Sequence, residues 1–281
     1  MQGTLLENAG RSLIRFFIAT FALTWTCFFV ADRVTRGHTA ILMLGVFAPS
    51  IVAIALTFRS EGRAGVESLL RRLLMWRVPL RFYVFALGYL AAIKGTVALL
   101  HRVATGRWPA FGTTPWYVML AATFISVAIG GQTGEEIGWR GYALPRLAHS
   151  IGLPAGSLLL GLIWAIWHLP LFFMQGTTTT GQSFPLYLLQ VTALSTAFAW
   201  LWMRTEGSLL PVMLLHAAIN NTKDIVPSAV EGGHDVFAPS TSLPAWLTVA
   251  LLWICAAYFL AACARSATKS GGSRLRFSHS M

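Results

Sequence analysis

Long apolar runs separated by short polar stretches make up the pattern of this chain. A helix needs about 20 mostly apolar residues to cross about 30 Å of hydrocarbon. Eight segments meet that test: Leu13–Ala31, Ala40–Phe58, Phe82–Leu100, Ala121–Leu144, Ala155–Gln175, Phe184–Met203, Ser208–Asp224 and Pro244–Ala264. The pattern therefore predicts an all-α, polytopic membrane helical bundle with about eight transmembrane helices.

A different periodicity appears between the second and third of these spans. In Gly65–Arg77 (GVESLLRRLLMWR), two pairs of leucines flank a pair of arginines, so that apolar and basic residues recur at helical spacing. Such a basic amphipathic helix is typical of a membrane surface. An ordinary loop is the alternative.

Composition and charge agree with a membrane location. Hydrophobic residues are 56% of the 281-residue chain and charged residues 11%, whereas a soluble domain has roughly 25% charged residues. The net charge is +11, but the cations lie in the gaps between apolar runs rather than in one patch. The lipid bilayer is thus the expected partner, and nucleic acid is not.

The distribution of basic residues predicts the orientation. Fifteen of the 21 Lys and Arg residues fall on the termini and the even-numbered loops. The odd-numbered loops hold five: Arg33, Arg36, Arg102, Arg107 and Lys223. Because cytoplasmic loops carry the excess of positive charge, both termini are predicted to be cytoplasmic. Ala- and Arg-rich usage and compact length favour a bacterial inner (plasma) membrane.

The domain organisation is simple. Residues 1–265 are expected to form a single transmembrane domain, and the polar, Gly/Ser-rich tail 266–281 is expected to be disordered and cytoplasmic. The three cysteines, Cys27, Cys255 and Cys263, lie inside apolar runs without a CxxC pair. They are expected to be buried small hydrophobic residues.

Ionisable residues inside a span are costly and usually functional. The fourth span contains Glu135, Glu136 and Arg140. Glu136 and Arg140 are four residues apart and share a helix face, so they are predicted to form a structural ion pair. Glu135 points about 100° away and is free to face a cavity and act as a base. Alternatively, the segment is a cytoplasmic loop in which both acids are solvated.

Glycines recur every four residues in the same segment, at Gly130, Gly134 and Gly138. This stripe of small residues predicts close contact with another helix.

Two further spans contain isolated polar residues. His168 is the sole ionisable residue of Leu158–Phe173 and precedes Pro170; it could also be an interfacial residue at a span end. His216 and Asn220 are four residues apart and share one helix face. The alternative for this pair is an interhelical hydrogen bond that joins helices. One acid, two His and one Asn at similar depth in three spans predict a shared polar cavity.

The three polar segments resemble the motifs of the CPBP family, also called the ABI or CAAX-protease-like family. Its motifs are Glu-Glu-xxx-Arg, Phe-xxx-His and His-xxx-Asn. They correspond here to Glu135-Glu136-xxx-Arg140, Trp164-xxx-His168 and His216-xxx-Asn220. The resemblance covers residues from about 120 to 225, and Trp164 replaces the usual Phe.

The resemblance implies a membrane-embedded endopeptidase that acts on peptides or membrane-associated proteins. Members cut prenylated CAAX proteins in eukaryotes, and bacterial members are associated with bacteriocin maturation or self-immunity. On this interpretation Glu135 and His168 activate a water molecule, and a carboxylate in apolar surroundings is a better base near neutral pH. His216 and Asn220 would donate hydrogen bonds to the oxyanion.

Alternatives to this mechanism and function stay open. Glu135, His168 and His216 could instead bind a divalent metal such as zinc, although no HExxH motif is present. Asn220 suits an oxyanion donor better than a metal ligand, which favours the metal-free version. A non-catalytic immunity or scaffold protein of the same fold is a second candidate function. A proton-coupled transporter, to which Lys94 in the third span gives some weight, is a third.

Overall fold

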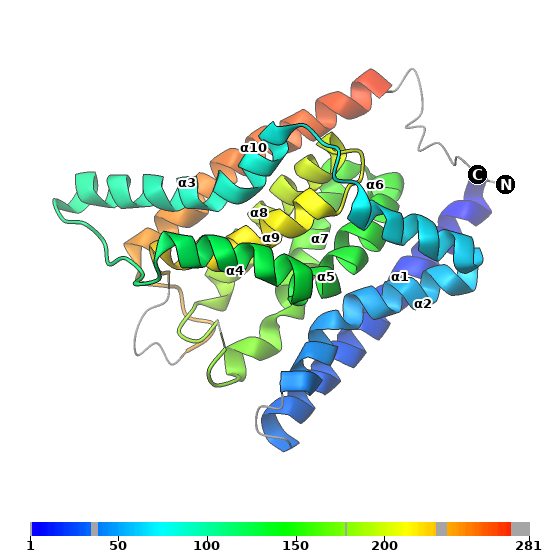
Figure 1. The fold of residues 1–281 in the computed structure, drawn as a ribbon, viewed down its shortest axis with the longest axis horizontal. Helices are drawn as coiled ribbons and strands as arrows, with labels where there is room; N and C mark the ends of the chain where they lie inside the picture. Colours follow the sequence, from blue (N-terminus) through cyan, green and yellow to red (C-terminus); the bar gives the residue numbers. More distant parts are fainter. Residues whose placement is uncertain (1, 35–38, 178, 229–234, 271–281) are drawn as a thin grey trace.

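Helices connected by loops make up the described chain, and no strand occurs in it (Figure 1). The computed structural model describes residues 2–34, 39–177, 179–228 and 235–270. The long helices are α1 (Gln2–Phe29), α2 (Thr39–Arg71), α3 (Leu80–Thr105), α4 (Trp116–Ile129), α7 (Leu153–Trp167), α8 (Phe184–Arg204), α9 (Leu210–Thr222) and α10 (Leu243–Ser270). Shorter elements are η1 (Val30–Val34), η2 (Arg72–Leu74), α5 (Gly131–Glu136), η3 (Ile137–Ala143), α6 (Leu144–Ile151), η4 (Leu169–Phe173) and η5 (Lys223–Ile225).

The polytopic, all-α prediction is confirmed. Among the described residues, six helices are long and apolar enough to cross a membrane. A seventh span results if the bent pair Trp116–Val127 and Gly131–Ile151 crosses as one unit. The count of six or seven, judged by length and composition, compares with about eight expected.

The difference arises at α9, which corresponds to the predicted seventh span Ser208–Asp224. This helix has 13 residues, or about 20 Å at 1.5 Å per residue, which is shorter than the hydrocarbon core. Residues 211–219 are all buried. Because protein surrounds the helix over this stretch, its length need not match the thickness of the bilayer.

The predicted fourth span is broken rather than continuous. Gly130 has an extended backbone (φ −91°, ψ −178°) between α4 and α5, and the two halves are bent by 45°. The chain then passes through the π-helix η3 before α6 begins. The motif acids therefore lie in a short, irregular segment and not in a regular membrane helix.

The predicted surface helix Gly65–Arg77 forms in part. It is helical to Leu74, where η2 ends, after a kink at Gly62, whose positive φ of 65° suits glycine. Leu69 is buried, whereas Leu74 and Trp76 are exposed, so the segment has an inner and an outer side. Helix does not continue to Arg77, because the backbone already leaves the helical region at Met75 (φ −78°, ψ 72°).

Close helix packing explains two of the three predicted glycines. A Cβ on Gly138 would lie 2.5 Å from backbone atoms of Pro49 in α2, and one on Gly134 would lie 2.8 Å from the Phe47 ring. Gly130 instead occupies the break between α4 and α5, where a Cβ would meet the carbonyl group of Ser126 in α4 and not a neighbouring helix. The close contact of Gly134 and Gly138 with α2 thus fixes the position of the acidic motif relative to that helix.

Two ends of the bundle are defined by contacts between segments at the ends of helices and in loops. At the first end, Ser208 Oγ donates to the Met75 carbonyl (2.7 Å), and Arg146 pairs with Glu61 (3.1 Å). At the other end, Gly112 N donates to the Ile225 carbonyl (3.2 Å). We call these the 208 end and the 225 end. Helix α8 runs between these two ends. At its start, Phe184 N donates to the Val236 carbonyl near the 225 end, and at its last residue Arg204 lies beside residues 74–79 at the 208 end.

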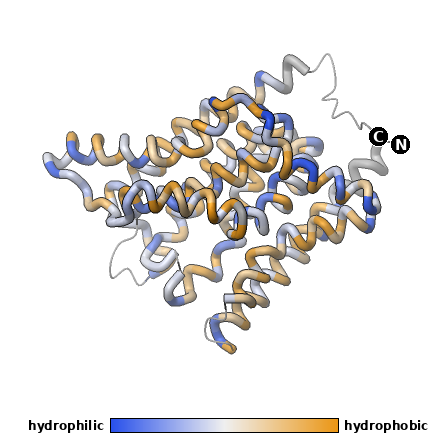
Figure 2. Tube along the Cα trace, in the orientation of Figure 1, coloured by the Kyte–Doolittle hydropathy of each residue, from blue (hydrophilic) through white to orange (hydrophobic). Residues whose placement is uncertain are grey.

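The remaining arrangement follows from packing between neighbours. Helices α1 and α2 form an antiparallel pair at one edge, α3 and α10 lie at another edge, and α5 to α9 fill the middle (Figure 1). Apolar positions run along the helices, and hydrophilic positions gather at their ends and in loops (Figure 2).

The helix α10 continues to Ser270, so the first five residues of the predicted tail are helical. Residues 271–281 lie outside the described part of the chain, and the expected disorder there stays a prediction. The cysteines are free within the described residues; Cys27 and Cys263 are buried and Cys255 is half-buried.

Candidate active site

The acidic motif lies in the interior of the bundle. Glu135 and Glu136 end α5, and Arg140 belongs to the π-helix η3. Glu135 is 6% exposed, and Glu136 and Arg140 are fully buried. The alternative of a solvated cytoplasmic loop is therefore wrong. Single-turn π segments occur frequently at functional sites.

A chain of three buried side chains crosses from η3 to α9. Arg140 Nη1 donates to Glu136 Oε1 at 2.7 Å, which confirms the predicted ion pair. The same oxygen lies 2.8 Å from His216 Nδ1. Because an ionised carboxylate only accepts hydrogen bonds, His216 Nδ1 is protonated, and its orientation is fixed by Glu136.

Aromatic rings enclose the guanidinium of Arg140. Its Cζ lies 4.2 Å from the ring centre of Trp164 and 4.0 Å from that of Phe198. Such cation–π contacts are strongest where water is excluded. Two adjacent rings, inclined at 74° to each other, and the carboxylate of Glu136 thus hold this charge in a helical interior.

Glu135 approaches the same histidine from its other side. The distance from Glu135 Oε1 to His216 Nε2 is 4.0 Å, beyond hydrogen-bond length. Its other oxygen, Oε2, accepts a hydrogen bond from Trp164 Nε1 at 2.8 Å. The carboxylate is thus oriented through one oxygen, while Oε1 is directed towards the imidazole.

Trp164 connects two of the motifs. Its indole donates to Glu135, and its carbonyl oxygen lies 2.8 Å from His168 Nδ1. Sequence reasoning treated Trp164 only as the aromatic residue of its motif. The signal it missed is that Trp, unlike Phe, has an N–H donor that normally finds a partner when buried.

His168 lies at the C-terminal end of α7, where the chain turns into η4 before Pro170. A carbonyl oxygen can only accept, so Nδ1 must carry the proton that bonds Trp164, and Nε2 of the neutral ring has a free lone pair. The ring packs against Trp167 and Tyr187 and is half-buried. No described contact joins His168 directly to Glu135.

Asn220 is separate from this cluster. It lies one helical turn after His216 on α9, as predicted, but its side chain is exposed. Its neighbour Asn221 is half-buried and donates to the Ala217 carbonyl at 2.8 Å. The structure therefore brings together four of the six predicted residues, with His168 attached through Trp164 and Asn220 at the margin.

Several atoms of the cluster have unused hydrogen-bonding capacity. Within the described part of the chain, Glu136 Oε2 and Arg140 Nε and Nη2 are buried without a partner. Buried polar groups are normally satisfied. The cluster is therefore not optimised as a simple structural pair.

The metal alternative receives no support from this geometry. Among the described residues, no three His, Cys, Asp or Glu side chains are grouped so that they could hold an ion. Glu135, His168 and His216 all belong to that part of the chain. We therefore derive no step through a metal.

Lys94, the basic residue inside α3, has a structural explanation. It is 2% exposed, and Nζ donates to the Val226 carbonyl (2.9 Å), Ser228 Oγ (3.0 Å) and Thr248 Oγ1 (3.3 Å). These bonds join α3 and α10 to the segment that follows α9. Its presence therefore no longer favours the transporter.

Fold and site together define a polytopic helical membrane protein with a buried carboxylate–imidazole cluster. A family model described as "Type II CAAX prenyl endopeptidase Rce1-like" matches residues 113–222, which include all three motifs. A similar protein is "CAAX prenyl protease 2" from Methanococcus maripaludis, 22% identical over 236 residues, covering 75% of this chain and 83% of that protein. Both comparisons thus support the resemblance of this chain to the CPBP, or CAAX-protease-like, family.

Proposed function

We propose that this protein is an intramembrane endopeptidase in which Glu135 is the general base. The observation that carries the proposal is a carboxylate in the bundle interior, 6% exposed, whose Oε1 lies 4.0 Å from His216 Nε2. It lies in the segment matched by the family model. A structural role for Glu135 would not require an oxygen directed at an imidazole beyond hydrogen-bond distance.

His168 is the proposed second acceptor for the attacking water. Its Nε2 has a free lone pair because Nδ1 bonds the Trp164 carbonyl. One water hydrogen would bond Glu135 and the other His168. The oxygen lone pair is then free to attack the substrate carbonyl, and Glu135 takes the proton in the same step.

His216 and Asn220 are the proposed donors to the oxyanion. For His216 to donate through Nε2, the ring must carry protons on both nitrogens. The carboxylates of Glu135 and Glu136, on its two sides, compensate that charge. Asn220, whose side chain is exposed on the same helix, would reach the oxyanion once a peptide is bound.

The second half of the reaction returns the enzyme to its starting state. The tetrahedral intermediate collapses as the C–N bond breaks, and Glu135 gives its proton to the leaving amine. Products are a new carboxylate and a new amino terminus, with one water consumed. Glu136 and Arg140 hold His216 in place throughout and exchange no proton.

The name of the similar protein indicates which substrates to test first. Synthetic peptides ending in a CAAX sequence, with and without a prenyl group on the cysteine, are incubated with purified protein in ¹⁸O-labelled water. We expect cleavage with one ¹⁸O in the new carboxylate, and loss of cleavage in Glu135→Gln. Glu67→Gln, which alters an exposed carboxylate paired with Arg63, is the matched control and should cleave normally.

The second candidate function is a non-catalytic immunity or scaffold protein. Its supporting observation is that the Arg140–Glu136–His216 chain would hold three helical elements together even without a reaction. That function would be favoured if neither peptide is cut and Glu135→Gln supports the host phenotype as well as the wild type. A Glu135→Gln variant that cleaves at the wild-type rate would refute the proposed mechanism.

A further inference from the structure

Accessibility of the candidate site increases towards one end of the bundle only. Along α9, residues 211–219 are buried and exposure begins at Asn220, five residues before Ile225. Along α7, Trp164 and Trp167 are buried, whereas His168 and the η4 residues 169–171 are half-buried. Both helices end at the 225 end.

The acidic segment shows the same gradient. Residues 135–144 are buried without interruption on the side that leads to α6 and the 208 end. On the other side of Glu135, buried Gln132 and Gly134 alternate with half-buried Gly131 and Thr133, and Ile129 is exposed. The residues that cover Glu135 are therefore less completely buried towards the 225 end than towards the 208 end, which makes the 225 end the shorter route for a peptide.

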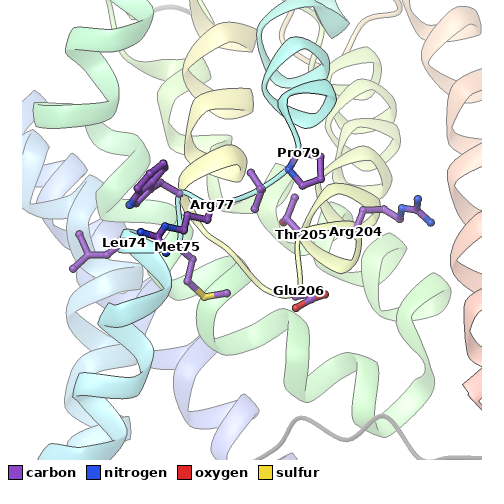
Figure 3. Close-up of a pocket in the computed structure, with 9 residues that line it drawn as sticks. Leu74, Met75, Arg77, Pro79, Arg204, Thr205 and Glu206 are labelled. Carbon is purple, nitrogen blue, oxygen red and sulfur yellow. The ribbon is translucent and has the colours of Figure 1, made fainter.

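The 208 end has a hollow of its own, but it is not part of the site. It measures about 460 Å³ and is lined by residues including Leu74, Arg77, Arg204 and Glu206 (Figure 3). None of the six motif residues lines it. This surface depression and the less buried side of the candidate site thus lie at opposite ends.

Charge differs between the two ends. Described basic residues at or near the 208 end are Arg11, Arg15, Arg59, Arg63, Arg71, Arg72, Arg77, Arg81, Arg146, Arg204 and Arg265. Those at the 225 end are Arg33, Arg102, Arg107 and Lys223. Positive charge marks the cytoplasmic side of short loops, so the 208 end faces the cytoplasm.

From these two gradients we infer that the site takes its substrate from the extracytoplasmic side. The substrate class is a peptide segment of a membrane-anchored or exported protein, presented at the outer surface of the bilayer. This inference rests on the proposed function for its chemistry. The orientation itself rests on charge and burial alone.

The orientation is tested with single added cysteines, read independently of any activity. Thr180→Cys is exposed near the 225 end, and Arg77→Cys is exposed at the 208 end. In spheroplasts, a membrane-impermeant maleimide should label Thr180→Cys as fully as after permeabilisation. Arg77→Cys should be labelled only after permeabilisation, and the parent protein gives the background of its native cysteines. The reverse pattern would overturn the inference.

Sidedness of cleavage is tested in vesicles sorted by the same labelling. Test peptides added outside should be cut by vesicles with the 225 end outward and not by those with the 208 end outward. Cleavage only with the 208 end outward refutes the inference while the proposed function stands. If the cysteines are labelled as expected but protein with an unaltered active site cleaves in neither orientation, the proposed function is refuted. The orientation of the bundle in the membrane is then still established by the labelling.

Discussion

Removing the carboxylate of Glu136 should destabilise the whole bundle. In Glu136→Ala, Arg140 loses its 2.7 Å ion pair and His216 loses the 2.8 Å acceptor at Nδ1. Both Glu136 and Arg140 are fully buried. Breaking a buried pair by removing one partner costs about 3–5 kcal/mol, because the other charge is left uncompensated. That is a large fraction of the about 5–15 kcal/mol that stabilises a typical protein.

The measurement is thermal unfolding of purified protein in detergent, compared with Glu135→Gln as a matched control. Gln at position 135 keeps an oxygen that can accept from Trp164 Nε1 and has nearly the same volume. We expect Glu135→Gln to unfold at the wild-type temperature while cleavage is lost. Glu136→Ala should unfold at a much lower temperature or fail to accumulate in the membrane.

A double variant keeps the reasoning testable if Glu136→Ala does not accumulate. Because the cost arises from the unpaired guanidinium, adding Arg140→Met should restore part of the lost stability, a coupling that a double-mutant cycle measures. Equal unfolding temperatures for Glu136→Ala and the wild type would refute the buried pair. A large loss of stability in Glu135→Gln would show that the two carboxylates have been assigned the wrong roles.

Three other outcomes follow from the same contacts. Trp164→Phe keeps the aromatic ring but removes the N–H that donates to Glu135, a hydrogen bond worth about 1.5–3 kcal/mol. Steady-state kinetics should therefore show a kcat/KM roughly 10- to 100-fold lower than that of the wild type. An unchanged kcat/KM would mean that another group orients Glu135. Gly138→Ala places a Cβ 2.5 Å from the Pro49 backbone and should cost about 1–3 kcal/mol of stability. Gly88→Ala, with nothing within 4 Å, is its control in thermal unfolding. Cleavage should persist in a chelator, because no three potential ligands are grouped among the described residues; activity lost to the chelator and restored by zinc would contradict this.

Local spacing was enough to predict part of the site. Glu136 and Arg140 pair as their i, i+4 separation predicts, whereas Glu135 does not contact Arg140 and accepts a hydrogen bond from Trp164. The distances that matter most were not accessible, because they join residues far apart in sequence. The contact between Glu136 and His216 spans 80 positions, and nothing in either motif indicates which acid His216 would contact.

The fold was predictable to the level of apolar runs. Hydropathy finds the long helices because lipid imposes a minimum apolar length on them. Hydropathy wrongly counts α9 as a full membrane span, since a helix enclosed by protein is as apolar as one in lipid. It also misses the break at Gly130, where the neighbouring sequence stays apolar but the backbone becomes extended.

The buried guanidinium of Arg140, packed against Trp164 and Phe198, has a consequence for biogenesis. On insertion scales, each charged residue at the centre of an isolated helix costs about 2.5–3.5 kcal/mol. The segment with Glu135, Glu136 and Arg140 emerges from the ribosome well before Phe198 and His216, which later enclose and pair with it. We therefore expect this segment to wait at the bilayer edge or in the translocon until α8 and α9 have been synthesised, so that a chain truncated before α9 should be degraded rather than stably integrated.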